Sequence, residues 1–406
     1  MRPGWFGPFL SLVKIAHLAD PHLGFRRYHR QTPSGINQRE ADVANAFRAA
    51  VDGVIAARPD AIILAGDLFH AVRPSNYSIV FAFRQLQRLR EELPKAPLIL
   101  IAGNHDTPRS SDTGSILLLY EELAVHVVVD EARRLVFPEL DLSVLAVPYA
   151  AMSAPDKVVL RPDGPEQYQV LALHFVLQGV FPPERYPMEL GAMLLDPEVL
   201  RREPWSYVAL GHYHVQAEMG KRIWYAGALD YVSPNPWGEL EDEARRGASG
   251  KGWLLVDLAE GTVRPMPVEP PRRVFDLRRL DAEGLSPGEV DKEIAKRLAA
   301  IPGGLADAVV RLVVREIPRH VVRELDHAAI RAAKASALHL HLDFRRPELS
   351  GSPGLGSPGR RQTLPELVTD YLRRRPLPER VPRDKFVALG VELLAELDDP
   401  SQGEAG

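Results

Sequence analysis

The stretch PLILIAGNHD, residues 97–106, is an unbroken apolar run that ends in four residues unsuited to the interior of a sheet. A run of this length, bounded by Pro and Gly, is typical of a strand that is covered on both faces, as in the parallel sheets of α/β proteins. Such folds carry their chemistry just beyond the carboxyl ends of the strands. The Gly-Asn-His-Asp ending therefore predicts a functional site at one edge of a sheet.

Four other stretches repeat the pattern of a buried strand that ends in polar residues: VKIAHLADPH (13–22), DAIILAGD (60–67), YQVLALHF (168–175) and YVALGHYH (207–214). Apolar residues at helical spacing predict amphipathic helices over 38–58 and over 75–93, the second capped by Ser75. The order is therefore β-α-β-α-β at the start of the chain. Eight polar side chains are expected at one rim: Asp20, His22, Asp67, Asn104, His105, His174, His212 and His214.

The later part of the chain reads as a second sheet and a small separate domain. Short strands are expected at 142–149, 223–229 and 252–258, with little helix between the last ones, which suggests a mixed or second sheet. A proline-rich link over 265–273 precedes an α+β pattern over 274–346. Within it we expect a helix from Ser286, a strand over 308–317, a helix over 322–335 and a strand over 338–344.

The C-terminal segments read as a tether that carries two helices. Residues 347–361 are rich in Gly, Ser and Pro, which predicts a flexible linker. Residues 362–398 carry two amphipathic helices, the first with a capping box of Thr363 and Glu366. Two short helices cannot bury their apolar faces alone, so we expect them to bind a partner, unless they fold back on their own chain. Residues 1–12 are expected as a ragged N-terminal extension and 399–406 as a disordered tail.

The composition limits the chemistry and the surroundings of the chain. Its 54 acidic and 50 basic residues nearly balance, so any DNA contact must come from local basic patches or bound metal ions. With no cysteine, metal ligands must be nitrogen or oxygen atoms. The apolar runs are too short for a membrane helix. We expect a soluble, cytoplasmic protein with no membrane contact, for which the lack of cysteine is suitable.

The polar strand ends together form a metal-binding set. Two carboxylates, one amide oxygen and several imidazoles suit Mn²⁺, Fe or Zn²⁺. Two divalent ions would outweigh the charges of Asp20 and Asp67, and the resulting positive site would attract hydroxide and phosphate. Each motif alone is a weak signal, because a histidine at a strand end is usually structural. Their ordered conjunction predicts a site with two metal ions for phosphoryl chemistry.

These motifs resemble a known family. The segments LADPHLGF, GDLFH followed by RPSN, AGNHD and GHYH are similar to calcineurin-like metallophosphoesterases, and within them to the double-strand-break repair nucleases called meiotic recombination eleven, or SbcD in bacteria. The resemblance covers nearly the whole chain and is more specific before Pro265 than after it. It implies a sandwich of two mixed sheets flanked by helices over 13–264, and a capping α+β domain over 274–346 that binds DNA.

The resemblance also implies an activity and partners. It implies an exonuclease that degrades duplex DNA ends from 3′ to 5′ and an endonuclease that cuts single strands, dependent on two divalent ions, most simply Mn²⁺. The helices of residues 362–398 would bind an SMC-like coiled-coil ATPase of the SbcC type, and two nuclease subunits would pair as a homodimer.

The family's site residues can be carried over motif by motif. Asp20, His22 and His214 would hold one metal ion, Asn104, His174 and His212 the other, and Asp67 would bridge them. His105 would donate a proton to the leaving sugar oxygen, which agrees with the titration range of imidazole. His70 would help to hold the phosphate, although a purely structural role in its loop is the alternative.

Two features depart from the family pattern. Pro21 stands between Asp20 and His22 and fixes the backbone there. The segment YAGALDYVSPNPWGEL, residues 225–240, stands where the family more often has a Gly-Ser pair and a shorter loop. Substrate contacts of this segment are therefore not carried over.

Two weaker patterns each have a plain alternative. The basic residues Arg26, Arg27, His29 and Arg30 follow the first ligand pair and are candidates for contacts to DNA phosphates, or else they are solvated surface. His339, His341 and Asp343 alternate on one strand, as in a metal site, but an ordinary half-exposed strand shows the same alternation.

Three functions remain open at this level. The first is a DNA-repair nuclease that works with an ATPase. The second is hydrolysis of a small phosphodiester or phosphomonoester such as a cyclic nucleotide, for which the capping domain and the C-terminal helices would have no purpose. The third is a non-catalytic scaffold for DNA repair, against which the complete set of ligand residues argues.

Overall fold

The computed structural model describes residues 13–108, 114–153, 158–178, 194–347, 364–375, 377 and 382–397. Backbone contacts divide the chain into two units, residues 1–346 and 347–406. The extension over 1–12, the linker from residue 348 to 361 and the tail over 399–406 lie outside the described residues.

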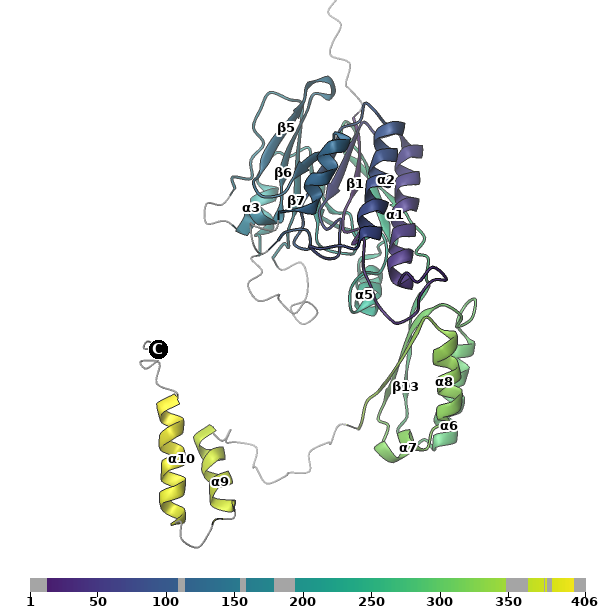
Figure 1. Ribbon diagram of the computed structural model, residues 1–406, viewed down its shortest axis with the longest axis vertical. Helices are drawn as coiled ribbons and strands as arrows, with labels where there is room; N and C mark the ends of the chain where they lie inside the picture. The colour runs from purple at the N-terminus through teal and green to yellow at the C-terminus, as the bar shows by residue number, and fades with distance from the viewer. Residues whose placement is uncertain are drawn as a thin grey trace, which may run out of the picture. The chain divides into compact units, whose positions relative to one another are not determined.

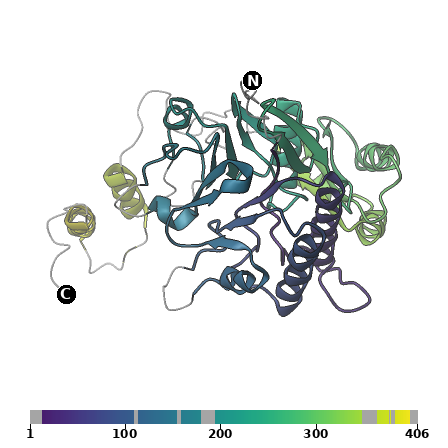
Figure 2. The same cartoon turned by 90° about the horizontal axis from the view of Figure 1, so that it is seen from above.

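The first sheet has six strands in the order β12-β11-β1-β2-β3-β4. Strands β1 to β4 run parallel to one another, and β11 and β12 extend the sheet in antiparallel fashion. Two helices, α1 and α2, lie side by side on its outer face (Figure 1, Figure 2). The bounds are β1 (Lys14–Leu18), α1 (Gln38–Ala57), β2 (Ala61–Ala65), α2 (Asn76–Glu92), β3 (Leu98–Ile101), β4 (His126–Val128), β11 (Gly252–Asp257) and β12 (Thr262–Pro267).

The predicted strands β1, β2 and β3 and the helices between them are confirmed. Helices α1 and α2 occupy the expected segments, and the hydroxyl of Ser75 caps α2 by accepting from the Ser78 N–H at 3.2 Å. Val43 and Phe47 of α1 pack with Leu64 of β2 in one apolar cluster between helices and sheet. The periodic apolar positions of the two helices thus pack against the sheet, as their spacing predicts.

A second sheet of six strands has the order β5-β6-β7-β8-β10-β9. It is mixed, because β6, β7, β8 and β10 are parallel whereas β5 and β9 are antiparallel to their neighbours. Ile63 and Ile99 of the first sheet share a buried apolar cluster with Val144 and Val170 of the second, so the two sheets pack face to face. The bounds are β5 (Arg133–Phe137), β6 (Leu142–Val147), β7 (Tyr168–His174), β8 (Tyr207–Gly211), β9 (Ala217–Gly220) and β10 (Ile223–Tyr225).

The prediction of little helix after β10 is wrong. The strand expected over 223–229 ends at Tyr225, and α5 (Pro236–Arg246) follows before β11. Helix α5 buries Glu239, Asp242 and Glu243. Its apolar stripe is limited to Trp237, Leu240 and Ala244, so the periodicity by which a helix is recognised in a sequence is short. Shorter connecting elements are η2 (Ile116–Leu123), η3 (Pro138–Leu140), α3 (Tyr149–Ser153) and α4 (Pro197–Arg201).

A third, small sheet forms the cap, residues 274–346. Its three parallel strands β13 (Val274–Asp281), β14 (Val309–Arg315) and β15 (His339–Phe344) carry α6 (Pro287–Ala299), α7 (Arg319–Arg323) and α8 (His327–Ser336) (Figure 1). The helix expected over 322–335 is in fact α7 and α8, because Asp326 caps a new helix by accepting from the Ala328 and Ala329 N–H groups. The expected link over 265–273 begins with strand residues, since β12 pairs with β11 as far as Pro267.

The second unit contains two helices, α9 (Leu364–Arg374) and α10 (Arg383–Leu397), in the segment where the sequence predicts them. They contact each other closely, because a Cβ at Gly390 of α10 would collide with Leu372 of α9. Tyr371 and Leu389 are exposed. No helix among the residues with described structure has the length and apolarity needed to cross a membrane.

Candidate metal centre

The loops that follow the strands of both sheets meet at one rim. The Asp20 N–H donates to the Gly66 carbonyl at 3.1 Å, which joins the loop after β1 to the end of β2. His174 closes β7, and its Nδ1 lies 2.8 Å from the carbonyl oxygen of Ala65. The second sheet therefore delivers its strand ends to the same rim as the first, as the sequence predicts.

Asp20, His22 and His214 form a first group at this rim. One potential ligand atom from each lies within 4.8 Å of the others. Nε2 of His22 and Nε2 of His214 are 3.1 Å apart, so these two nitrogen atoms point toward each other. Asp20 and His22 are buried.

Asp67, His174 and His212 form a second group with the same spacing. The amide oxygen Oδ1 of Asn104 lies 3.1 Å from His174 Nε2 and 2.9 Å from His212 Nδ1, so Asn104 belongs to this group as well. The four side chains come from β2, β3, β7 and β8 or the residues that directly follow them. Strand ends separated by more than a hundred residues thus contribute to a single cluster.

One carboxylate lies between the two groups. Oδ2 of Asp67 is 3.5 Å from Nε2 of His22 in the first group and 3.4 Å from Nε2 of His174 in the second. Its other oxygen, Oδ1, accepts the backbone N–H of His105 at 2.9 Å. Asp67 is the residue in the position from which one oxygen can serve both groups.

The backbone at the rim is unusual. Four of the site residues have positive φ angles: Asp20 (52°), His22 (47°), Asp67 (52°) and His212 (98°). Such conformations cost about 1–3 kcal/mol for non-glycine residues and concentrate at functional sites. The glycines of the motifs meet a different constraint, because a Cβ at Gly103 would collide with the carboxylate of Asp67, and one at Gly211 with the carbonyl of Ala65.

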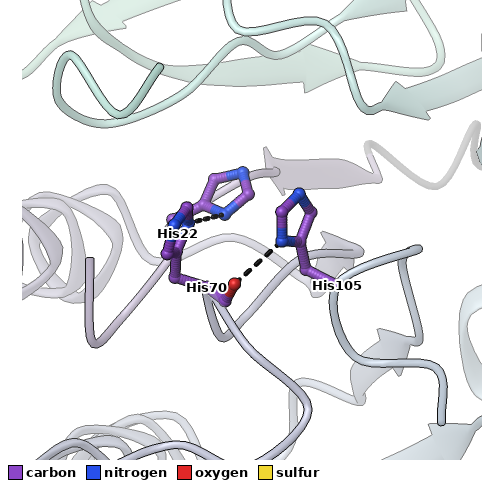
Figure 3. A group of neighbouring side chains, drawn as sticks. All are labelled: His22, His70 and His105. Carbon is purple, nitrogen blue, oxygen red and sulfur yellow. Dashed lines mark hydrogen bonds between the residues drawn. The ribbon is translucent and has the colours of Figure 1, made fainter. Parts of the chain in front are cut away.

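His70 and His105 lie beside the first group, next to His22 (Figure 3). Nδ1 of His105 donates to the carbonyl oxygen of His70 at 2.8 Å, and Nδ1 of His70 lies 3.3 Å from Nδ1 of His22. The rings of His70 and His105 stack with centroids 5.2 Å apart. Burial, assisted by His105, lowers the pKa of His70 to about 4, which makes His70 a neutral imidazole at pH 7.

The charges of the cluster favour a cation. Burial raises the pKa of Asp20 to about 6, against the opposing effect of His174 and His214. Burial also disfavours the charged form of Asp67, but the imidazoles, His174 above all, hold its pKa well below its usual range. Two buried carboxylates, an amide oxygen and four imidazole rings that face inwards are a donor set suited to Mn²⁺, Fe or Zn²⁺.

Sequence reasoning gave no role to Asp106, the last residue of the Gly-Asn-His-Asp motif. Its carboxylate is 1% exposed and accepts three backbone N–H groups, from Leu68 and Gly103 at 3.1 Å and from Phe69 at 3.0 Å. Burial, with a contribution from Asp67, raises its pKa to about 7. Asp106 joins the loops after β2 and β3. Its place in the Gly-Asn-His-Asp motif was the sequence feature that could have indicated this structural role.

A second omission is the pair of Glu239 on α5 and Lys251 just before β11. Oε1 of Glu239 lies 3.5 Å from Nδ1 of His214, on the side of the ring away from His22. Burial opposes the charge of Glu239, yet Lys251 and His214 hold its pKa at about 2. No sequence signal pointed to it, because the segment departs from the family pattern.

The four basic candidates for DNA contact lie in the loop between β1 and α1. Arg26 pairs with Glu40 at 2.7 Å, and Arg30 pairs with Asp307 of the cap. Arg27 donates to the Pro234 carbonyl at 3.3 Å, and His29 is exposed. Within the described part of the chain, Arg26 and Arg30 thus share their charge with carboxylates, which leaves Arg27 and His29 as the stronger candidates.

The alternating residues on β15 pack against other side chains. His339 stacks on Tyr28 with centroids 4.2 Å apart, and His341 stacks on Trp237 of α5 at 5.7 Å. Asp343 pairs with Arg345 at 2.8 Å. The ordinary-strand interpretation is favoured, because among the described residues these three do not form a group with metal-ligand spacing.

Comparisons with known proteins agree with the geometry. Curated relatives named DNA double-strand break repair protein Mre11 occur in Sulfurisphaera tokodaii (30% identical over 258 residues, 62% of this chain and 61% of the relative), Methanococcus maripaludis (27% over 259 residues, 61% and 63%) and Saccharolobus solfataricus (27% over 276 residues, 63% and 66%). This chain thus spans less than two thirds of the length of these relatives.

The family profile described as Calcineurin-like phosphoesterase matches residues 13–216, half of the chain. This match contains every candidate metal ligand, and it ends two residues after His214. The two packed mixed sheets and the paired His/Asp groups at their rim are the arrangement that the sequence motifs predict. The chain therefore belongs to the calcineurin-like phosphoesterase family.

Proposed function

We propose that this chain is a DNA nuclease of double-strand-break repair that hydrolyses phosphodiester bonds with the help of two divalent metal ions, most simply Mn²⁺. The observation that carries the proposal is the position of Asp67, whose Oδ2 faces His22 in one group and His174 in the other. The names of the relatives support DNA as the substrate.

In this proposal Asp20, His22 and His214 hold one ion, Asn104, His174 and His212 hold the other, and Asp67 serves both. Two divalent ions in such a site activate water and neutralise phosphate charge. The chain supplies the buried carboxylate of Asp67 between the two groups, and His70 and His105 beside the first group.

His105 and His70 act on the substrate. Because Nδ1 of His105 is occupied by the carbonyl of His70, its Nε2 is the nitrogen that can give a proton to the leaving sugar oxygen. His70 is held neutral by burial, so it can donate a hydrogen bond to a phosphate oxygen without carrying a charge. His105 is therefore the proposed acid and His70 the proposed phosphate contact.

We assign the binding of partners to the other parts of the chain. The cap, residues 274–346, would bind DNA together with Arg27 and His29. Helices α9 and α10, in the segment 362–398, would bind an SMC-like coiled-coil ATPase, for which their separate packing and the exposed Tyr371 and Leu389 are suitable. Pairing of two copies as a homodimer belongs to the same proposal and is based on the family resemblance.

The test compares substrates. The purified full chain is incubated with end-labelled duplex DNA, with single-stranded DNA, with a cyclic nucleotide and with bis-p-nitrophenyl phosphate, each with Mn²⁺ or with a chelator. Asp67→Asn serves as the variant that should be inactive on all of them. We expect metal-dependent degradation of DNA, and hydrolysis of the small esters alone would show a small-molecule phosphodiesterase instead.

A further inference from the structure

Helix α5 places a buried carboxylate against the outer edge of His214. Glu239 is 5% exposed, and its Oε1 lies 3.5 Å from Nδ1 of His214 and accepts the Ser233 N–H at 3.1 Å. The other ring nitrogen of His214, Nε2, is 3.1 Å from Nε2 of His22. The two nitrogens of one ring therefore face a carboxylate on one side and the proposed ligands of a metal ion on the other.

Lys251 fixes this arrangement from behind. It is 3% exposed, and its ammonium group contacts Oε2 of Glu239, Oε1 of Glu243 at 3.1 Å and the carbonyl oxygen of His214 at 2.9 Å. It thus holds both the carboxylate that faces the ring and the backbone that carries the ring. A buried ion pair often contributes little to stability. The positions of Lys251 and Glu239 therefore need an explanation other than stability.

We propose that Glu239 is a positioning residue for His214: it accepts the Nδ1–H of the ring and so fixes the tautomer and orientation in which Nε2 presents its lone pair to a metal ion held with Asp20 and His22. Histidines that bind metals commonly donate their second N–H to a carboxylate, and removal of that carboxylate weakens metal binding by about 10–100-fold. This inference rests on the proposed two-metal function.

The same helix offers a matched control. Glu243 also contacts Lys251, and it accepts the hydroxyl of Tyr231 at 2.9 Å. Among the contacts of the described residues, its carboxylate does not reach His214. Glu243→Gln therefore removes a buried charge next to Lys251 and leaves the ring of His214 with its partner.

The experiment measures Mn²⁺ binding to the full chain by titration calorimetry, after removal of metal with a chelator. The wild-type chain should bind two ions. Glu239→Ala should lose about 10–100-fold in affinity at one site and keep the other, and Glu239→Gln should lose less because its amide oxygen can still accept from Nδ1. Electron paramagnetic resonance should show a magnetically coupled pair in the wild type and in Glu243→Gln, but isolated Mn²⁺ in Glu239→Ala at the same concentration.

Three results would overturn the inference. The first is a Glu239→Ala variant that binds both ions as tightly as the wild type. The second is a loss in Glu243→Gln as large as in Glu239→Gln, since the cause would then be the unbalanced charge of Lys251. The third is an equal loss of affinity at both sites, which indicates general damage to the fold. Circular dichroism shows whether Glu239→Ala is misfolded. If it is, the affinities of Glu239→Gln decide between the two explanations. Failure of the wild type to bind a pair of ions would instead refute the proposed function itself.

Discussion

Replacement of His105 by Ala is expected to slow DNA cleavage strongly while metal binding is kept. The side chain of His105 contributes a hydrogen bond from Nδ1 to the carbonyl of His70, whereas its contact with Asp67 is made by the backbone N–H and survives the substitution. None of the seven proposed ligand side chains is changed. The variant thus removes a proton donor beside the two groups and leaves the groups themselves in place.

The size of the effect depends on the leaving group. A general acid contributes about 10²–10⁴-fold to a rate, or about 2.7–5.4 kcal/mol. The sugar alkoxide released from DNA needs a proton, so the full loss is expected in kcat. The nitrophenolate released from bis-p-nitrophenyl phosphate is stable without one, and for this ester we expect a loss of about tenfold or less.

The assay therefore determines kcat and KM of His105→Ala on both substrates, with Mn²⁺ affinity from calorimetry. His126→Ala, which removes an exposed histidine at the start of β4, the end of the strand away from the rim, is the control and should behave as the wild type. Equal losses on the two substrates would refute the role of His105 as an acid. A loss of bound Mn²⁺ would show instead that His105 is needed to hold the metal.

Three further predictions concern stability. Mn²⁺ at 100 times its Kd should stabilise the wild type by about 2.7 kcal/mol per site. In thermal unfolding, Asp67→Asn should show little of this stabilisation by Mn²⁺. A stabilisation as large as in the wild type would contradict the proposal that Asp67 serves both metal ions. Trp237→Ala removes a side chain packed on Val309 and Leu338 of the cap and should cost about 3 kcal/mol in urea unfolding, whereas an unchanged midpoint would contradict the packing. Burial lowers the pKa of His17 from 6.5 to about 3. Between these two pH values only the unfolded chain binds this proton, so stability falls by about 1.4 kcal/mol for each unit by which the pH drops. His17→Gln should therefore reduce the loss of stability between pH 7 and 5, and an unchanged loss would refute this.

The rim could be predicted because its signal is local. Each ligand directly follows a run of buried apolar residues, and parallel strands necessarily end at a common edge, so spacing along the chain was enough to bring Asp20, Asp67 and Asn104 together. His174 and His212 come from the second sheet. The sequence patterns placed their strands at the same rim as the others, and a mixed or second sheet was expected only from the strands at 142–149, 223–229 and 252–258. The order of the strands in the two sheets depends on long-range packing such as the contact of His174 with Ala65.

The parts that sequence reasoning missed are stabilised by charges rather than by apolar periodicity. Glu239, Glu243 and Lys251 are each of a type that is usually exposed, and only the fold shows that they are buried against one another. Similarly, the pairing of Arg30 with Asp307 joins residues far apart in the sequence and is invisible to local patterns. Arg30 was therefore read as a free basic residue, whereas it connects the loop after β1 to the cap.

Helix α5 contacts the cap on one side and His214 on the other, and this explains why a helix with many charged residues is partly buried. Trp237 and Glu239 are two residues apart and so point roughly 200° from each other around the helix. Trp237 packs on the cap and donates from Nε1 to the Phe275 carbonyl at 3.1 Å, whereas Glu239 faces His214. The side of the helix that faces the cap therefore carries an aromatic residue, whereas the side that faces His214 carries a carboxylate. Since one short helix contacts both the cap and the metal centre, displacement of the cap must either break the contacts of Trp237 or move the carboxylate that faces His214.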